Sequence, residues 1–120
     1  MFEEKKIVTV SDHNGIRVAT VQANRMLDEI EIREIGRALT LLIREYPDSS
    51  LVVDFEKVSN MSSSALGMLI TIHKRLIEAG GELRLCNIND SIKEVFRITR
   101  LDEILVIDKN VAASVANIKQ

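Results

Sequence analysis

The sequence is poor in the residue types that support disulfides, metal sites or base stacking. Its 120 residues include one cysteine, one proline and no tryptophan, and aromatic residues make up 3%. The single Cys86 cannot form an internal disulfide and has no second cysteine with which to bind a metal ion. Such scarce aromatic side chains provide no series of stacking platforms for single-stranded nucleic acid. We therefore expect a protein of a reducing compartment without a structural disulfide.

Excess basic charge and long hydrophobic runs are also absent. The formal net charge is −2, whereas a nucleic-acid-binding domain usually has a basic face. No apolar run approaches the roughly 20 residues that cross a bilayer. The polar start MFEEKKIVTV does not resemble a signal peptide. We expect one cytoplasmic domain over residues 1–120, with no nucleic-acid partner and no direct membrane insertion.

The hydrophobic pattern of the chain predicts alternating strands and helices. Two β-branched runs meet at Asn14-Gly15, which predicts a hairpin because Asn-Gly tolerates the positive φ angles of a type I′ turn. Apolar residues at helical spacing predict helices within residues 27–46, 65–81, 89–100 and 110–120. Short apolar runs predict strands within residues 50–55, 82–88 and 104–107. Strands separated by helices pair in parallel, so we expect an α/β fold: a small mixed, mostly parallel sheet with an N-terminal hairpin and about four helices.

Two of these helices carry more specific expectations. In the segment 65–81, the residues expected to share a buried face are Leu66, Leu69, Ile70, Leu76 and Ile77. His73 falls within that arc, and we interpret it as a packed or semi-buried core histidine. In the segment 89–100, the residues expected on one buried side are Ile92, Val95, Phe96 and Thr99. Asn89 is a candidate N-cap there, and Ser91 with Glu94 forms a competing capping box.

No catalytic, metal-binding or phosphate-loop motif is recognisable in the sequence. A serine nucleophile needs a nearby base, but His73 lies about ten residues, or ~15 Å of helix, from the nearest serines, and His13 lies in the hairpin region. Two separated histidines and one cysteine have no metal-ligand spacing, and SSSALG lacks the Lys-Ser/Thr of a phosphate loop. We interpret Asp54 and Glu56 as salt-bridged or solvated, and Cys86 as a buried, inert thiol. The sequence therefore predicts no enzyme, no cofactor and no metal.

The stretch VSNMSSSALGML places three serines, Ser62, Ser63 and Ser64, directly before an apolar helical run. One serine is enough to cap a helix, through a hydrogen bond from a backbone N–H worth about 1 kcal/mol. The other two either tolerate the turn or include a phosphate acceptor, and the residues alone leave both possibilities open. A helix N-terminus accommodates an anion, and a phosphate there would repel a partner with an acidic or apolar surface.

Residues 50–107 resemble the STAS domain, in particular the bacterial anti-sigma factor antagonists. The family pattern is a strand, Val-x-x-Met-Asp-Ser-Ser-Gly-Leu-Gly, a helix, Gly-Gly and a strand. It is matched by Val58, Met61, the run Ser62-Ser63-Ser64-Ala65-Leu66-Gly67 and Gly80-Gly81. In the family, the first serine after the aspartate is phosphorylated by a serine kinase that is also the anti-sigma factor. The resemblance implies a module that binds this kinase when unphosphorylated, is released on phosphorylation and is reset by a serine phosphatase.

By position, the resemblance makes Ser63 the phosphate acceptor. The implied partner-binding residues surround it: Asp54, Ser59, Asn60, Ser62, Ser63 and Ser64. Three features depart from the family pattern. Ser62 replaces the usual aspartate and becomes a competing acceptor, and Ala65 replaces a glycine. The segment before the first helix lacks the family's Gly-Glu-(Leu/Ile)-Asp, which leaves Asp28 as the candidate acidic residue.

The resemblance also admits a function without a switch. In this alternative the chain is a non-switching STAS subunit of a stress-signalling scaffold or a membrane-transport complex. Ser62–Ser64 would then only cap the helix and shape a packing surface. The substitution Ser63→Asp distinguishes the two functions, because only the switch predicts that it abolishes binding to a kinase.

Overall fold

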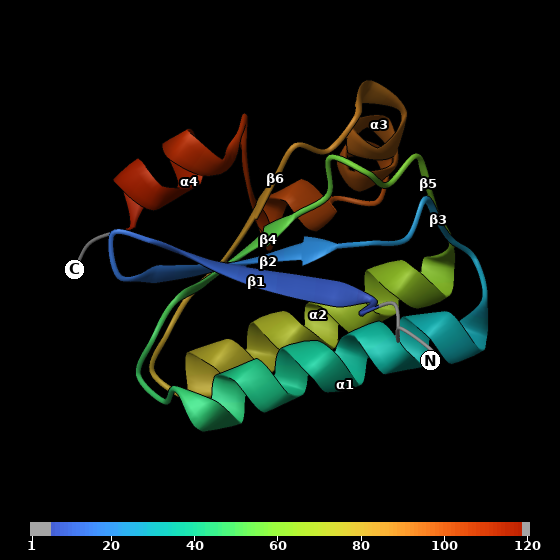
Figure 1. Ribbon diagram of the computed structural model, residues 1–120. Helices are drawn as coiled ribbons and strands as arrows, with labels where there is room; N and C mark the ends of the chain where they lie inside the picture. Colours follow the sequence, from blue (N-terminus) through green and yellow to red (C-terminus); the bar gives the residue numbers. More distant parts are fainter. Residues whose placement is uncertain (1–5, 119–120) are drawn as a thin grey trace.

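A five-stranded sheet in the order β1-β2-β4-β6-β7 forms the centre of the computed structural model, which describes residues 6–118 (Figure 1). Its strands are β1 (Val8–His13), β2 (Ile16–Val21), β4 (Leu51–Asp54), β6 (Leu83–Cys86) and β7 (Val106–Asp108). β1 pairs antiparallel with β2, and the remaining neighbours pair in parallel. The expected α/β class, with its mixed, mostly parallel sheet and N-terminal hairpin, is confirmed.

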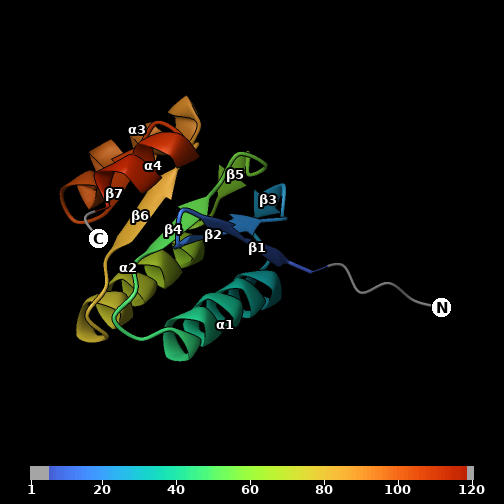
Figure 2. The ribbon, with the colours of Figure 1, turned by 60° about the vertical axis from the view of Figure 1, so that its left-hand side comes forward.

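In the described residues, four α-helices lie between and after the strands: α1 (Glu29–Glu45), α2 (Ser63–Glu78), α3 (Asp90–Ile98) and α4 (Val111–Asn117). Figures 1 and 2 show α1 and α2 side by side against one side of the sheet and α4 on the other. The larger apolar core joins the sheet to α1 and α2, and α3 adds Ile92 and Phe96 to it. The smaller core beneath α4 consists of Ile16, Val18, Val52, Cys86 and Ile118. The two faces of the sheet are therefore held by very different amounts of apolar contact.

Two tight turns form where the sequence predicts them. Asn14 and Gly15 have φ angles of 55° and 86°, as a type I′ hairpin turn requires. At the end of α2, the backbone N–H of Gly81 donates to the carbonyl of Leu76 at 2.9 Å, which closes the last turn. A Cβ on Gly81 would lie 2.2 Å from the carbonyl oxygen of Ser49, so only glycine allows this close approach of two loops.

Some predicted buried faces differ from those in the structure. The buried stripe of α2 runs through Leu69, Ile72 and Leu76. Ile77 follows Leu76 by one residue, which turns its side chain by about 100° around the helix axis, and it is 56% exposed. Val95 and Thr99 are likewise exposed, since the short α3 buries only Ile92 and Phe96.

Two local predictions, for His73 and for the N-cap of α3, agree with the structure. His73 is half-buried, in agreement with its interpretation as a semi-buried histidine. Asn89 caps α3, because its Oδ1 accepts the backbone N–H of Ile92 at 2.9 Å, and the competing Ser91–Glu94 box does not form.

Three short elements were not predicted from the sequence. β3 (Arg25–Met26) and β5 (Asn60–Met61) form a small parallel pair, and η1 (Leu101–Glu103) is a 3₁₀ turn before β7. The β3–β5 pair lies directly before the three serines, so it helps to position the chain that leads into them.

Candidate functional site

The three serines begin α2, next to the edge of the sheet where the parallel strands β2, β4 and β6 end (Figure 1). The chain reaches them through β5, which pairs with β3 so that Met61 lies opposite Met26. The backbone N–H of Ser62 then donates to the carbonyl of Met26 at 2.9 Å. The start of α2 is therefore fastened to the segment that follows β2, and its position does not depend on the helix alone.

The serines differ in how their hydroxyls are used. Ser62 is the N-cap of α2: its backbone is extended, and its Oγ accepts the backbone N–H of Ala65 at 3.3 Å. Ser62 is half-buried, whereas Ser63 and Ser64 are exposed. Within residues 6–118, neither exposed serine has a side-chain hydrogen bond. The structure thus identifies Ser62 as the capping serine and leaves the hydroxyls of Ser63 and Ser64 facing solvent.

Asp54, the last residue of β4, is a buried carboxylate. It is only 6% exposed, and its Oδ1 accepts the backbone N–H of Glu56 at 3.0 Å and the Asn87 Nδ2 at 2.9 Å. It forms no ion pair with any described residue, so the expectation of a salt-bridged or solvated carboxylate is wrong for Asp54. A buried carboxylate needs hydrogen-bond donors, and here the donors come from the loops after β4 and β6. Asp54 therefore joins these two loops, and a direct partner contact at this residue stays a prediction.

Ser59 and Asn60 complete the loop before the serines. The Ser59 Oγ donates to the Asn24 Oδ1 at 2.9 Å, and the Ser59 N–H donates to the Asn24 carbonyl at 2.7 Å. The side chain of Asn89, which caps α3, donates from Nδ2 to the Ser59 carbonyl at 3.1 Å. Asn60 is exposed beside these contacts. The exposed members of the predicted partner-binding set are thus Ser59 and Asn60 before the helix and Ser63 and Ser64 in the first turn of α2. Hydrogen bonds to Asn24 and Asn89 hold the loop at Ser59 in place.

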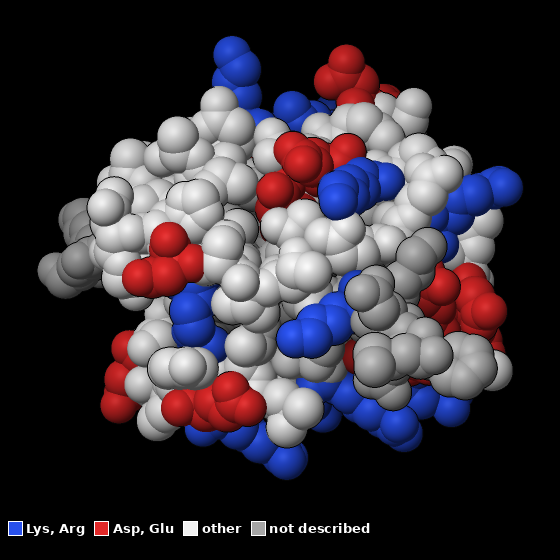
Figure 3. All heavy atoms as spheres, viewed as in Figure 1, with Lys and Arg blue, Asp and Glu red and all other residues white. Residues whose placement is uncertain are grey.

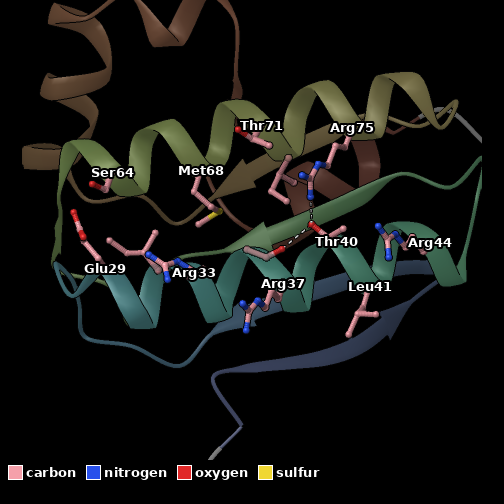
Figure 4. Close-up of a pocket in the computed structure, with 13 residues that line it drawn as sticks. Glu29, Arg33, Arg37, Thr40, Leu41, Arg44, Ser64, Met68, Thr71 and Arg75 are labelled. Atoms are coloured by element: carbon pink, nitrogen blue, oxygen red, sulfur yellow. Dashed lines mark hydrogen bonds between the residues drawn. The ribbon is translucent and has the colours of Figure 1, made fainter.

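The acidic residue expected near the serines takes a structural position. Asp28 is the N-cap of α1, and its Oδ1 accepts the Ile30 N–H at 2.8 Å. Its neighbour Glu29, which was not predicted as a site residue, lines the same groove as Ser64 and lies at the same end of it (Figure 4). The only available signal was the pair of acidic residues at the start of the predicted helix, and nothing in the sequence related Glu29 to Ser64.

The structure shows how the metal-ligand residue types and the single cysteine are placed. Among residues 6–118, no group of three or more histidine, cysteine, aspartate or glutamate side chains is placed to hold a metal ion. Burial, followed by the nearby Asp54 charge, raises the pKa of the Cys86 thiol to about 12, which keeps this thiol protonated and inert. No helix in the described part of the chain combines the length and apolar character needed to cross a membrane. The arrangement presents hydroxyls at a helix start, which suits binding and modification.

Comparisons with known proteins agree with this geometry. The family model described as STAS domain matches residues 8–117. The anti-sigma-B factor antagonist of Staphylococcus aureus (strain NCTC 8325 / PS 47) is 28% identical over 89 residues, which cover 74% of this chain and 82% of that protein.

Solved structures show the same fold. The crystal structure of an anti-sigma factor antagonist from Mycobacterium paratuberculosis aligns with a TM-score of 0.80 at 18% identity, over 94% of this chain and 93% of that one. The phosphorylated form of the Bacillus cell fate determinant SpoIIAA aligns with a TM-score of 0.67 at 16% identity, over 93% of this chain and 99% of that one.

Proposed function

The chain belongs to the STAS domain family, and from this we propose that it is an anti-sigma factor antagonist switched by phosphorylation of Ser63. In its unphosphorylated form it binds an anti-sigma factor that is also a serine kinase. The kinase transfers the γ-phosphoryl group of ATP to the Ser63 Oγ, releasing ADP and a proton, and the antagonist dissociates. A serine phosphatase hydrolyses the phosphate and restores the binding form. The protein itself performs no catalysis.

The observation that carries this proposal is the difference between Ser62 and Ser63. A kinase must bring the serine oxygen in line with the γ-phosphate. This requires a solvent-exposed hydroxyl that is not held by a hydrogen bond within the protein. The Ser63 side chain is exposed and has no hydrogen-bond partner among the described residues. The competing acceptor, Ser62, is half-buried and caps α2. Phosphorylation of Ser62 would give up a cap worth about 1 kcal/mol, which favours Ser63.

A phosphate on Ser63 would act through charge at the docking surface. The first turn of α2 contains no acidic residue, so its free backbone N–H groups and the positive end of the helix dipole accommodate the anion. The helix need not unfold to accept about −1.5 to −2 charges. The added charge and bulk then stand where the partner docks, so binding is lost while the fold is kept.

We assign different roles to the members of the predicted partner-binding set. Asn60, Ser63 and Ser64 are exposed and contact the anti-sigma factor. Asp54, Ser59 and Ser62 position that surface through the hydrogen bonds of the loops and of the α2 cap. Substitution of the first group is expected to change affinity directly, and substitution of the second to change it through the loop.

The proposal is tested by measuring binding of purified anti-sigma factor kinases from the same cells by isothermal titration calorimetry. We expect the unmodified protein and Ser63→Ala to bind, and Ser63→Asp to bind at least tenfold more weakly, a loss of about 1.4 kcal/mol. Ser63→Ala should also stay bound when ATP is added. The matched control is Ser91→Asp, which places the same charge on an exposed serine in the first turn of α3 and should leave the affinity unchanged.

One feature favours the alternative of a non-switching STAS subunit in a scaffold or a membrane-transport complex. Ser62 stands where the family pattern has an aspartate, so one carboxylate beside the acceptor is missing. In that alternative Ser63→Asp binds its partners as tightly as the unmodified protein, and ATP releases nothing. The same titration therefore separates the two functions.

A further inference from the structure

A groove runs between α1 and α2, on the side of these helices that faces away from the sheet. Its volume is about 730 Å³, and it ends at Glu29 and Ser64 (Figure 4). The family match over residues 8–117 includes both helices, but of the predicted site residues only Ser64 lines the groove. The groove therefore adjoins the serine surface, which consists of Ser59, Asn60, Ser63 and Ser64, at one end and extends away from it.

The groove is strongly basic in a protein whose net charge is −2. Its lining includes four arginines, Arg33, Arg37 and Arg44 from α1 and Arg75 from α2, and a single carboxylate, that of Glu29. No arginine of this set is ion-paired within residues 6–118. In Figure 3 basic side chains protrude along the lower margin of the molecule, over α1. Four unpaired positive charges against one carboxylate create a local positive potential in the groove that attracts anionic partners.

Between the arginines the lining combines apolar residues with Thr40 and Thr71. Gly36 faces α2, and a Cβ there would lie 3.1 Å from the Cγ of Met68, so the two helices approach closely at this point. The half-buried Met68 and Leu41, which is 54% exposed, contribute apolar surface to the lining. The Arg75 guanidinium of α2 donates to the Thr40 Oγ1 of α1 at 2.7 Å (Figure 4). This hydrogen bond joins the two helices that form the groove.

The spacing of the arginines indicates the shape of the occupant. Arg33, Arg37 and Arg44 lie along one helix, so the row extends over about 16 Å at 1.5 Å per residue. A single phosphate would contact only part of such a row. An amphipathic helix matches it along its length, because it carries an apolar stripe for the floor and carboxylates beside that stripe.

We propose that the groove between α1 and α2 is a docking surface for an acidic amphipathic helix of a partner protein. Apolar residues of that helix contact Met68 and Leu41, and its carboxylates pair with Arg33, Arg37, Arg44 and Arg75. The proposal does not depend on phosphorylation of Ser63. It gives the protein a second binding surface, which meets the serine surface only at Ser64.

The test uses a synthetic 18-residue helical peptide with leucines along one face and glutamates on the others, labelled for fluorescence anisotropy. A matched peptide carries lysines in place of the glutamates. We expect the glutamate peptide to bind, more weakly at 0.5 M than at 0.05 M salt, and the lysine peptide not to bind. The double variant Arg33→Glu/Arg37→Glu should weaken binding at least tenfold. The control Lys74→Glu/Lys93→Glu makes the same charge change at exposed lysines outside the groove and should keep the affinity within twofold.

Two further measurements keep the test decisive. Circular dichroism melting checks that the variants are folded, which is expected because Arg33 and Arg37 are exposed and ion-paired to no described residue. Amide NMR shifts on adding the glutamate peptide should cluster in residues 29–44 and 64–75. Absence of peptide binding, equal binding of the lysine peptide, equal losses in the control, or shifts confined to residues 59–63 would overturn the proposal. So would phosphatidylglycerol vesicles that bind through Arg33 and Arg37 while the peptide does not.

Discussion

Two polar clusters of this protein differ in how many of their polar groups form hydrogen bonds within the protein. Around Asp108, the carboxylate accepts hydrogen bonds from the Arg84 Nε at 2.7 Å, the Ser114 Oγ at 2.7 Å and the Asn117 Nδ2 at 3.0 Å. Asp108 is 9% exposed, so its carboxylate is largely closed to solvent, although Asn117 is exposed. At the start of α2, Ser62 is bonded, but Ser63 and Ser64 are exposed and without side-chain partners among the described residues.

The first cluster holds the fold together, whereas the second leaves polar groups available for partners. The Asp108 cluster fastens α4 over the smaller of the two apolar cores, where little else holds the helix. Asp108 and Ser114 are buried, so leaving either of them unpaired is costly. The exposed serines can be changed or modified at almost no cost to the fold. Substitutions in a hydrogen-bonded cluster such as that of Asp108 are therefore expected to change stability. Exposed groups without partners, such as Ser63, are candidates for regulation.

Breaking the closed cluster is expected to have the largest effect. Asp108→Ala leaves the largely buried Arg84 with only its longer ion pair to Glu82, at 3.6 Å, and we expect it to lower the free energy of unfolding by about 3 kcal/mol. Urea denaturation measures the change. The control Asp102→Ala removes an exposed aspartate and should change stability by less than about 0.5 kcal/mol. Equal effects of the two substitutions would contradict the account.

Acid should weaken the same cluster without any mutation. Hydrogen bonds from Arg84, then from Ser114 and Asn117, lower the pKa of Asp108 from 3.8 to about 2. Because the folded state favours the ionised carboxylate, its contribution is complete above pH 4 and is lost as the pH falls towards 2. The expected loss is about 2 kcal/mol, measured by urea denaturation across this range. Asp108→Asn should be less stable at pH 7 and should lose this part of the pH dependence; an unchanged pH profile would refute the assignment.

Substitutions of the neighbouring serines Ser62 and Ser63 should have different effects on the free energy of unfolding. We expect Ser62→Ala to lower the free energy of unfolding by about 1 kcal/mol, because the Ala65 N–H loses its cap. Ser63→Ala should change it by no more than a few tenths of a kcal/mol, since no described contact is lost. Thermal melts of the two variants, compared with the unmodified protein, make the test. A larger loss for Ser63→Ala than for Ser62→Ala would show that the capping serine has been misassigned.

The smallest expected signal is at Cys86, which lies in the core beneath α4. Its thiol is protonated at pH 8 because burial raises the pKa to about 12, so iodoacetamide should not label the native protein within an hour. Asp108→Ala loosens α4 and should make labelling measurable, as followed by intact mass. Rapid labelling of the unmodified protein would contradict the closed state of this region.

Most of the fold could be predicted from the sequence because its elements have strong periodic patterns. The Asn14-Gly15 turn, the Gly80-Gly81 helix end and the order of strands and helices all follow from local rules and are confirmed. The pairs Arg25–Met26 and Asn60–Met61 are too short to show any period, so β3 and β5 could not be predicted.

The candidate site was predicted only in part. Its location at the three serines came from the motif, but which serine caps α2 depends on a backbone geometry that three identical side chains cannot reveal. The buried position of Asp54 depends on Asn87, 33 residues away in the chain. The arginine groove combines residues of two helices, and no local pattern relates Arg75 to the arginines of α1.

Phosphorylation of Ser63 is tested by phosphosite mapping with mass spectrometry on the protein isolated from its own cells, before and after stress. We expect phosphate on Ser63, with an occupancy that changes between the two conditions. Phosphate on Ser62 alone, or an unmodified peptide in every condition, would contradict the assignment of Ser63 as the switch.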